Sequence, residues 1–528
     1  MTITVVDTTL ADIEKRTITN YARRNRLRIW LAWIYGGIFL ASFACFYTIW
    51  FTDTFDNYLT SQMELRNGSN TFDWWIRPPV KSKYKVYVFN YTNVDEFEAG
   101  EARKLRVQEL GPYIYQETLT RVNVALQEDN GTVTFQDERS YEWTGGRPDN
   151  DTVVVPNVPL MSVTAYVRDW NVMLRLSVNM MLASLQERTF VKETAGGFIW
   201  GYDTELFHML KPIIMLQQDI SFDKFGMLAM KKGIDKDRIT MRTGSRGMDS
   251  VGMIERVNGV NNRHIWDDER CDKISGTDGS RFPAHLLKDT NQTLSMYLKE
   301  MCRMVPLHFA EKTITHGIPS LRYKLTPDVY NFSYEQNKCF CPKVDGTRVC
   351  PPAGIFNVSA CMYGVPFLSS FPHFYGGDKS LLEHVDGLNP RQEVHESYMD
   401  IHSRLAAPVG GWSRIQINVE VRKANAVSFL GRLKDGTILP LIWVEAGVDE
   451  LPAQVLEILK AAHFTAANVE MTLQWGSVIV MILSLSAIIA CLWKHCVERN
   501  MKIRKKSFIP NNILVHAEQP SRIALIKN

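Results

Sequence analysis

The sequence predicts a mixed α/β domain that lies outside the membrane and is held by two transmembrane helices. Two long stretches without charged residues, one toward each end of the 528 residues, predict the helices. The segment between them has strand-like runs at both of its ends, one helical block, and six of the nine cysteines. It shows no repeat and no change of composition, so we expect a single domain at residues 52–470.

The two apolar stretches are residues 29–51 and residues 471–493. About 20 apolar residues cross the core of a bilayer, so each stretch is long enough to be a transmembrane helix. A buried core helix is the alternative for runs of this kind, and we favour the membrane. The first stretch is too long for the apolar part of a signal peptide and lacks a small-residue cleavage site, so we expect an uncleaved anchor.

Basic residues flank the two stretches on the sides away from the central segment. They are Lys15, Arg16, Arg23, Arg24, Arg26 and Arg28 before the first stretch, and Lys494, Arg499, Lys502, Arg504, Lys505 and Lys506 after the second. Flanks rich in Lys and Arg stay in the cytosol. We therefore expect cytosolic tails at residues 1–28 and 494–528, with the central domain outside.

The glycosylation sequons and the cysteines agree with this topology. All seven N-x-[ST] sequons lie in the central segment, at Asn67, Asn90, Asn130, Asn150, Asn291, Asn331 and Asn357. An even number of cysteines in the same segment predicts disulfides, and they are Cys271, Cys302, Cys339, Cys341, Cys350 and Cys361. A metal site is the competing interpretation of Cys339 and Cys341, but they lack the CxxC spacing and histidine partners of such sites.

The central domain combines strands with one helical block. Runs rich in β-branched and aromatic residues predict strands at residues 84–91, 113–116, 153–155, 414–421 and 438–444. Apolar residues recur with helical spacing over about residues 162–187. Because strands occur both early and late in the segment, we expect one sheet system closed by its first and last strands, which brings the two anchors together.

Composition and motifs give no support to catalysis. With 60 basic and 57 acidic residues, the net charge of +3 does not suggest a nucleic-acid binder held by bulk charge. The G-x-S-x-G, H-E-x-x-H, Walker A and G-x-G-x-x-G motifs are absent. We interpret the run HIWDDE at residues 264–269 as an acidic loop and His373 as a core residue. We expect no enzyme activity, no metal and no cofactor.

A series of short motifs follows in order along nearly the whole central segment. They are WIRPP at 75–79, YVFNYTN at 87–93, VQELGPYIY at 107–115, WGYD at 200–203, CDKISGTDG at 271–279, GIP at 317–319, CFC at 339–341, SFPHF at 370–374, DGLNP at 386–390 and RIQIN at 414–418. Together they resemble the class B scavenger receptors, a family that includes a fatty-acid translocase, a high-density-lipoprotein receptor, a lysosomal integral membrane protein and insect sensory-neuron membrane proteins.

The resemblance implies an antiparallel β-barrel-like ectodomain with an apical helical bundle, at about residues 162–220, and an internal hydrophobic tunnel toward the membrane. An apolar conduit would remove most of the cost of moving lipid through water, which is about 0.8 kcal/mol per CH₂. The expected partners are lipids or lipoprotein particles, and a homo-oligomer is a further possibility. The family pattern also implies the disulfides Cys271–Cys339, Cys302–Cys361 and Cys341–Cys350.

The apical helices are where the family recognises ligands, and the residues expected there are Met180, Met181, Glu187, Arg188 and Lys192. Residues 182–192 lack the lysine cluster that some members carry for anionic ligands. The block is instead rich in methionine, with Met161 and Met173 beside the residues named above. Methionines at helical spacing usually pack in a core, which is the favoured interpretation, and a pliable apolar binding surface is the alternative.

Three functions fit these observations: a lipid-uptake receptor, an adhesion or sensory co-receptor, and a lysosomal sorting receptor or lipid exporter. We expect the plasma membrane, with endosomes or lysosomes as the alternative. The run RIALI at residues 522–526 is similar to a dileucine signal, but Ser521 stands where an acidic residue belongs. Cys491 and Cys496 lie beside basic residues at the inner end of the second span, which makes them candidates for palmitoylation, with plain packing as the alternative.

Overall fold

The structure, a computed structural model, describes residues 3–215, 222–344 and 346–507, so the RIALI run lies outside the described residues. The chain divides into two units. One unit consists of Met1–Phe55 and Ala466–Asn528. The other is Asp56–Thr465, which we name the ectodomain after the topology expected from the sequence.

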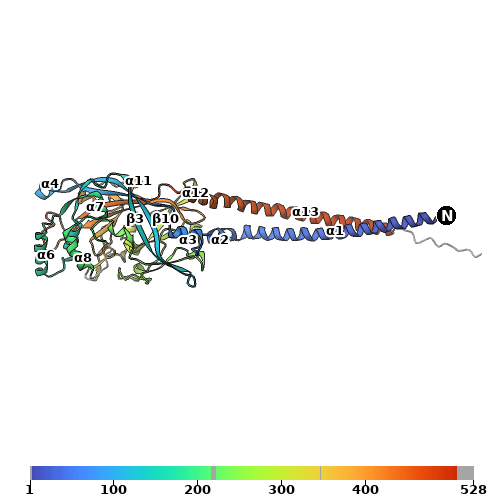
Figure 1. Cartoon of the computed structure of the whole chain (residues 1–528), viewed down its shortest axis with the longest axis horizontal. Coiled ribbons are helices and arrows are strands. Elements are labelled where there is room, and N and C mark those ends of the chain that lie inside the picture. Colours follow the sequence, from blue (N-terminus) through green and yellow to red (C-terminus); the bar gives the residue numbers. More distant parts are fainter. Residues whose placement is uncertain (1–2, 216–221, 345, 508–528) are drawn as a thin grey trace, which may run out of the picture. The chain divides into compact units, whose positions relative to one another are not determined.

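The first unit contains two long helices, α1 (Ile3–Phe51) and α13 (Ala466–Ser507), which carry the two predicted apolar stretches (Figure 1). The helical stretches Thr19–Phe51 and Ala453–Met501 are long and apolar enough to cross a membrane, and little of either is buried within the protein. Apolar side chains exposed all around a helix are typical of a membrane span. The chain is therefore a two-span membrane protein. Within the unit the helices contact each other, for example where the rings of Trp50 and Trp475 lie 5.8 Å apart.

The ectodomain is built on a sheet of 15 strands. Eleven of them form one continuous path in the order β8-β7-β3-β2-β1-β19-β18-β17-β11-β10-β9, with antiparallel neighbours. Their bounds are β1 (Lys83–Tyr91), β2 (Leu105–Gln127), β3 (Thr132–Gly146), β7 (Ile239–Arg242), β8 (Ile254–Val257), β9 (Leu294–Leu298), β10 (Arg303–Thr315), β11 (Ile318–Leu325), β17 (Ser397–His402), β18 (Pro408–Glu420) and β19 (Ile438–Gly447).

The sheet closes almost into a barrel. Its two edge strands, β8 and β9, are linked by the segment around Thr277, which belongs to the CDKISGTDG motif. The Ile254 N–H donates to the Gly276 carbonyl at 2.8 Å on the β8 side. On the β9 side the Thr277 N–H donates to Ser295 at 3.0 Å, and Tyr297 donates back to Thr277 at 2.8 Å. This link occupies backbone groups that an open sheet edge would leave unpaired.

The first and last strands of the domain are neighbours in the barrel, as the strand pattern predicts. β1 pairs with β19 from Lys83 opposite Gly447 to Val88 opposite Ile442. β19 is a nearly continuous apolar run that is buried along most of its length, the pattern of a strand covered on both faces. The predicted strands fall within β1, β2, β4 (Thr152–Pro156), β18 and β19, although β18 ends at Glu420, one residue before the predicted end.

The predicted helical block at residues 162–187 is wrong as a single helix, because the structure has two. These are α5 (Val158–Tyr166) and α6 (Val172–Ser184). α5 ends at Tyr166, and Asn171 begins the second helix: its backbone is extended, and its side-chain oxygen caps α6 by accepting the Leu174 N–H at 3.0 Å. The region expected to hold the apical helices, about residues 162–220, also contains the strand β5 (Phe190–Thr194) and the helices α7 (Ala195–Trp200) and α8 (Glu205–Met215), and its last five residues lie outside the described residues.

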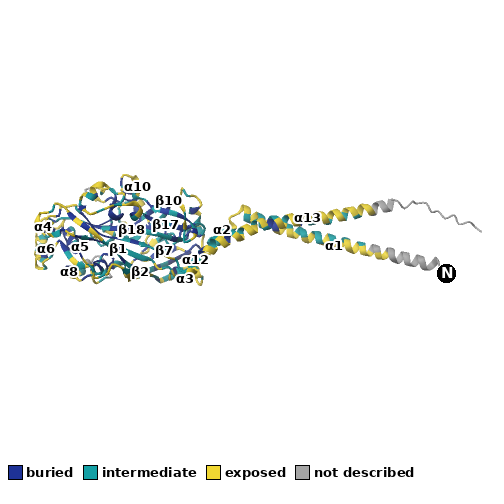
Figure 2. Ribbon diagram, turned by 90° about the horizontal axis from the view of Figure 1, so that it is seen from above, coloured by how far each residue is buried: buried dark blue, intermediate teal, exposed yellow. Residues whose placement is uncertain are grey.

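The two ends of the ectodomain differ in their elements. Figures 1 and 2 show α4 (Val94–Ala99) and α6 at one end, which we name the apical end. At the opposite end, named the anchor end, lie α3 (Asn70–Ile76) and α12 (Ala453–Lys460). The chain enters the ectodomain shortly before α3 and leaves it shortly after α12.

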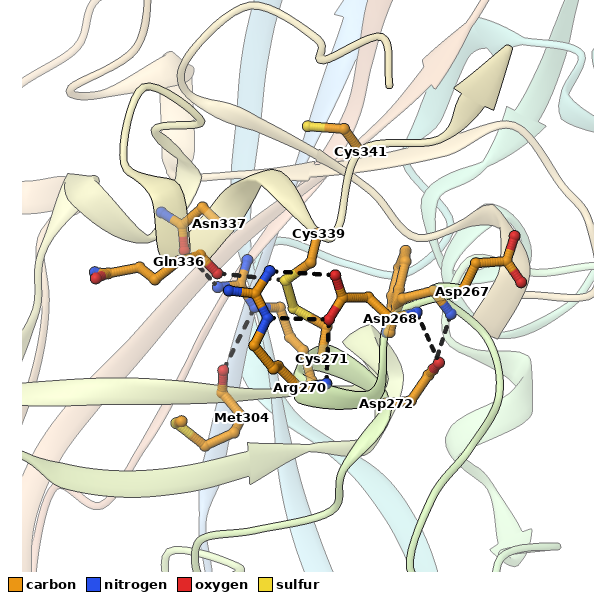
Figure 3. Close-up of a disulfide and its surroundings, with 12 residues drawn as sticks. Asp267, Asp268, Arg270, Cys271, Asp272, Met304, Gln336, Asn337, Cys339 and Cys341 are labelled. Atoms are coloured by element: carbon orange, nitrogen blue, oxygen red, sulfur yellow. Dashed lines mark hydrogen bonds and ion pairs between the residues drawn. A yellow bond between two sulfur atoms is a disulfide. The ribbon is translucent and has the colours of Figure 1, made fainter. Parts of the chain in front are cut away.

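Three disulfides tie the segment between the CDKISGTDG motif and residue 361. Cys271 pairs with Cys339, Cys302 with Cys361, and Cys341 with Cys350, which are the same pairs that the family resemblance implies. Figure 3 shows the first bond next to Arg270, whose Nε lies 3.2 Å from Asp268 Oδ1. Arg270 and Asp268 thus close a local turn beside the disulfide.

Candidate functional site

A cavity of about 520 Å³ lies inside the barrel at the anchor end. Its walls come from the inner face of the sheet and from α3 and α12, and most of the lining is apolar. Representative lining residues, one from each of six elements, are Leu119 (β2), Met296 (β9), Leu307 (β10), Leu325 (β11), Met399 (β17) and Leu459 (α12).

The alternation of side chains along β2 explains how this strand supplies both the cavity and the outer surface. Successive side chains of a strand point to opposite faces. Glu117, Leu119 and Arg121 all line the cavity, whereas Thr118 between them is exposed. β2 therefore offers matched inner and outer positions one residue apart.

Aromatic residues of the WIRPP motif form part of the cavity wall. Trp75 lines the cavity together with Pro78 and Pro79. Its ring stacks on Phe72 with the centroids 5.7 Å apart and meets the ring of Phe135 edge-on at 4.8 Å. These contacts fix the wall, so the motif that carries the family resemblance also shapes the site.

The charged residues that line this cavity are Glu117, Arg121 and Arg281. Glu117 accepts a hydrogen bond from the Tyr141 hydroxyl at 2.9 Å, and the Arg139 Nε lies 3.2 Å from the same oxygen. Burial lowers the pKa of Arg281 to about 10. The sequence did not identify these three residues. Glu117 and Arg121 show only the alternation common to any inward-facing strand, and Arg281 lies outside the helices and strands.

A hydrogen-bonded network joins Glu109 of β2, whose side chain is 33% exposed, to the buried residues His373 and Trp443. The His373 Nδ1 accepts the Asn389 N–H at 3.1 Å, so the ring proton is on Nε2, which donates to Glu109 at 2.5 Å. The Trp443 Nε1 donates to the same carboxylate at 2.8 Å. Burial alone would raise the pKa of Glu109, but the hydrogen bonds from His373 and Trp443 lower it. Both nitrogens of the buried His373 are occupied by structural bonds, which confirms it as a core residue.

The acidic run at residues 264–269 is also structural. The Asp272 carboxylate accepts the backbone N–H groups of Ile265 at 2.6 Å and Trp266 at 2.8 Å, so it holds the run as a loop. Across the described ranges, no group of three His, Cys, Asp or Glu side chains is placed to hold a metal ion.

The apical end carries an exposed apolar surface on α6 and the segment before it. We name this surface the apical face, and it consists of Tyr166, Trp170, Val172, Met173, Leu174, Leu176 and Met180. Met173 is 71% exposed and Met180 is 66% exposed, whereas Met161 is fully buried. The interpretation of the methionines as core is therefore right for Met161 and wrong for Met173 and Met180. Met181 is half-buried and packs against the core.

The other predicted apical residues do not join the apical face as one cluster. Glu187 accepts a hydrogen bond from Asn157 Nδ2 at 2.6 Å, and burial raises the pKa of its carboxyl group. Arg188 is exposed and lines a smaller cavity of about 350 Å³ beside Glu187. Lys192 is exposed on β5, opposite Val154 of β4.

The predicted modification sites are accessible in differing degrees. Asn67, Asn130, Asn150 and Asn291 are exposed, and Asn90, Asn331 and Asn357 are half-buried. Cys491 and Cys496 are free thiols on α13, the second exposed and the first half-buried.

Comparison with known proteins places this arrangement among relatives. The model of the CD36 family matches residues 34–492. Scavenger receptor class B member 1 of Sus scrofa is 29% identical over 420 residues, which cover 78% of this chain and 80% of that protein. Scavenger receptor class B member 1 of Mus musculus is 30% identical, with 73% and 75% covered. Lysosome membrane protein 2 of Homo sapiens is also 30% identical, with 75% and 81% covered.

Proposed function

Because the chain belongs to the CD36 family, we propose that it is a class B scavenger-type receptor that binds hydrophobic ligands and passes lipid to the membrane through the interior of its ectodomain. The observation that carries this proposal is the apolar cavity inside the barrel at the anchor end. The names of two kinds of relative, a scavenger receptor and a lysosome membrane protein, agree with a receptor held in a membrane.

The physical advantage of such a route is that lipid avoids water. Each CH₂ exposed to water costs about 0.8 kcal/mol, so an acyl chain that leaves a membrane or a particle needs an apolar environment along its way. The cavity at the anchor end offers walls of Leu, Met, Trp and Pro side chains. Transfer of this kind needs no bond to be made or broken, and the proposal includes no catalytic step.

The apical face supplies the second part of the proposal, which is capture of the ligand. Contiguous exposed apolar surface on a soluble domain marks an interaction site. Methionine suits ligands of varied shape, because its unbranched thioether adapts to different surfaces. We therefore place capture at the apical face and transfer at the anchor-end cavity.

Blocking the cavity tests the proposal. We expect Leu119→Trp to reduce uptake of labelled lipid into cells while binding of the ligand at the cell surface stays normal, because the added indole fills the cavity. Thr118→Trp is the matched control, since it adds the same bulk on the outer face of the same strand. Equal uptake by both variants and the unmodified protein, at equal surface levels, would exclude the cavity as the route. An adhesion or sensory co-receptor would then be favoured.

A lysosomal function is the second candidate, supported by the matches to lysosome membrane protein 2. The plasma membrane is our proposed location. Immunofluorescence with a lysosomal marker in unpermeabilised and permeabilised cells separates the two locations.

We also propose the covalent modifications that the topology implies. If the seven sequons carry glycans, glycosidase treatment should lower the apparent mass of the protein, because it removes them. Palmitoylation at Cys491 and Cys496 would be lost from acyl-exchange labelling in the double Cys→Ser variant. Glycosylation outside the membrane and palmitoylation at its cytosolic side both agree with the topology expected from the basic flanks.

A further inference from the structure

We propose that three arginines on the outer face of the barrel, Arg238, Arg242 and Arg256, form a binding surface for a linear sulfated polysaccharide. We name this surface the basic stripe. It lies on β7 and β8 and on the residue before β7, and none of its members lines the cavity at the anchor end. The proposal therefore goes beyond lipid transfer. It is carried by exposed positive charge that the described residues do not neutralise.

The alternation of side chains along β7 points two of the arginines outward. Ile239 and Met241 are buried in an apolar cluster on the inner face of the sheet. Successive side chains of a strand point to opposite faces, so Arg238 and Arg242 point away from that cluster. Both arginines are exposed. The stripe therefore lies on the solvent side of the sheet.

A β-bulge brings the third arginine to the same face. Thr240 lies opposite Arg256, and the register between β7 and β8 then shifts because Glu255 is an extra residue in β8. The Arg256 side chain is 54% exposed. Arg238 is two residues from Thr240, which makes it a diagonal neighbour of Arg256, and such neighbours lie about 7–8 Å apart. Arg242 is joined to Arg256 through Glu255.

The charges of the stripe are not balanced. In the part of the chain that the structure describes, Glu255 is the one carboxylate in ion-pair contact with these arginines. Its oxygens lie 3.6 Å from Arg242 Nε and 3.6 Å from Arg256 Nη2. Both distances exceed the roughly 2.7–2.9 Å of a charge-assisted hydrogen bond. Three arginines against one glutamate leave two positive charges, and the guanidinium N–H groups remain accessible to a ligand.

The strand beside the stripe supplies neutral polar side chains. The outer positions of β3 next to β7 are Thr134 and Gln136. The Thr134 and Thr240 hydroxyl groups lie 2.9 Å apart, and the Gln136 amide donates to the Asp235 carbonyl at 2.8 Å. These groups carry no charge, so they leave the positive potential of the stripe uncompensated on this side.

The shape of the stripe favours a polysaccharide over an acidic protein. Arg238 and Arg242 are four residues apart on an extended segment, which corresponds to about 13 Å, so the charges follow a line. Protein partners are held mainly by aromatic or apolar anchors in pockets, and the stripe lines neither of the two cavities described above. Oxyanions such as carboxylates and sulfates match the planar fork of a guanidinium group. With the topology expected from the sequence, the ectodomain meets polysaccharides that carry both groups.

Binding to the full-length protein in phosphatidylcholine nanodiscs tests the basic stripe. The probes are a heparin octasaccharide, the same octasaccharide without its sulfates, and polyglutamate of similar length. We expect the sulfated probe to bind at least about 10-fold more tightly than the other two. Its affinity should fall about 10-fold or more between about 50 and 200 mM salt, because binding releases ions condensed on the polyanion.

The other outcomes of this comparison overturn the proposal. Absence of binding by the sulfated octasaccharide at the lower salt concentration would exclude the stripe as a polyanion site. Equal or tighter binding of polyglutamate would assign the surface to an acidic protein. Equal binding of the octasaccharide without sulfates would show that sulfate is not recognised.

A triple variant assigns binding to the stripe. We expect the combined changes Arg238→Gln, Arg242→Gln and Arg256→Gln to weaken binding of the sulfated octasaccharide about 10- to 100-fold, because three exposed charge pairs are lost. The matched control removes the same charge from exposed arginines outside the stripe, with the changes Arg103→Gln, Arg106→Gln and Arg391→Gln. Unchanged affinity in the first variant, or equal loss in both, would exclude the stripe.

Removal of the glutamate should have the opposite effect. Glu255→Gln frees Arg242 and Arg256 from their shared carboxylate, so we expect the sulfated octasaccharide to bind about 2- to 5-fold more tightly. Glu96→Gln is the control, because it removes an exposed carboxylate on α4, away from the stripe. Unchanged or weaker binding by the Glu255→Gln protein would show that the ligand does not lie against these two arginines.

Discussion

The two ends of the ectodomain both present apolar side chains, but they do so in opposite ways. At the apical end, α6 has one buried residue, Leu182, and Met173 and Met180 project into solvent. At the anchor end, apolar residues such as Leu307 and Leu325 are buried in strands that enclose a cavity. The apical end therefore suits contact with a large or variable object, and the anchor end suits a molecule small enough to be enclosed.

The difference also concerns charge and rigidity. The anchor-end cavity contains arginines that are fixed by hydrogen bonds and ring contacts. The apical face is built mainly of flexible or aliphatic side chains on one short helix, which can adapt but discriminate weakly.

Loss of a disulfide should affect both ends of the ectodomain alike, because it should destabilise the whole domain. Cys302 precedes β10, whose Leu307 lines the cavity, and pairs with Cys361. We expect Cys302→Ser with Cys361→Ser to lower the free energy of unfolding by about 2–5 kcal/mol and to retain the protein in the secretory pathway. The measurement is surface labelling together with thermal unfolding of the purified full-length protein.

The free thiol Cys45 provides the control for that experiment. Cys45→Ser breaks no disulfide, so its surface level should match that of the unmodified protein. Normal surface level and stability in the Cys302 and Cys361 double variant would contradict the structural role of this bond. Peptide mapping without reduction should recover the three pairs directly.

Acid should weaken the anchor end through His402. Burial lowers the pKa of this fully buried imidazole to about 4. Its Nδ1 accepts the N–H groups of Arg404 and Leu405 at 3.1 and 3.2 Å, and its Nε2 donates to the Leu459 carbonyl of α12 at 3.2 Å. The ring must therefore be neutral in the folded protein.

The direction of the pH dependence follows from this depressed pKa. An unfolded histidine takes up a proton near pH 6.5, so below that pH the unfolded chain binds more protons than the folded one. Stability should fall between about pH 6.5 and pH 4, by at most about 1.4 kcal/mol per pH unit for this group. His402→Gln should flatten the decrease in unfolding temperature across this window, whereas substitution of the exposed His264 should not. The same slope in all three proteins would rule out His402 as the group responsible.

Features that depend on residues close together in the sequence could be predicted, and features that depend on distant residues could not. The spans follow from local composition, and β1 and β19 follow from local β-branched and aromatic residues. The cavity could not be predicted, since Leu119, Leu307 and Met399 come from strands far apart in the sequence, and alternation looks the same for a core wall and a cavity wall. The pairing of Arg121 with Asp278 is invisible for the same reason.

The helical region shows a second limit of sequence patterns. Helical periodicity indicates that a helix has an apolar face, but it does not say whether another element covers that face. Met161 and Met173 therefore look alike in the sequence, although one is fully buried and the other is largely exposed. Asn171 is a signal that could have located the break between α5 and α6, because asparagine is a favoured helix cap.

Substitutions on the apical face should have the smallest effect on stability. They should also separate most clearly the functions of the two ends. We expect the double change Met173→Asp and Met180→Asp to alter the free energy of unfolding by no more than about 0.5 kcal/mol, because neither side chain is packed in the core. The surface level should be normal. Ligand capture should be lost, since two carboxylates would be placed in an apolar contact, and binding of labelled lipoprotein or lipid vesicles to cells measures this.

Met161→Asp is the matched control, because it makes the same chemical change at a fully buried methionine of α5. A carboxylate there has no partner to replace water, so we expect misfolding and intracellular retention. If the Met173 and Met180 double variant were retained in the same way, the apical face would be a packed surface and the contrast between the ends would fail. If it reached the surface and still captured ligand, capture would have to occur elsewhere on the ectodomain. Only normal surface level with lost capture, set against the normal capture and lost transfer expected of Leu119→Trp, assigns capture to one end and transfer to the other.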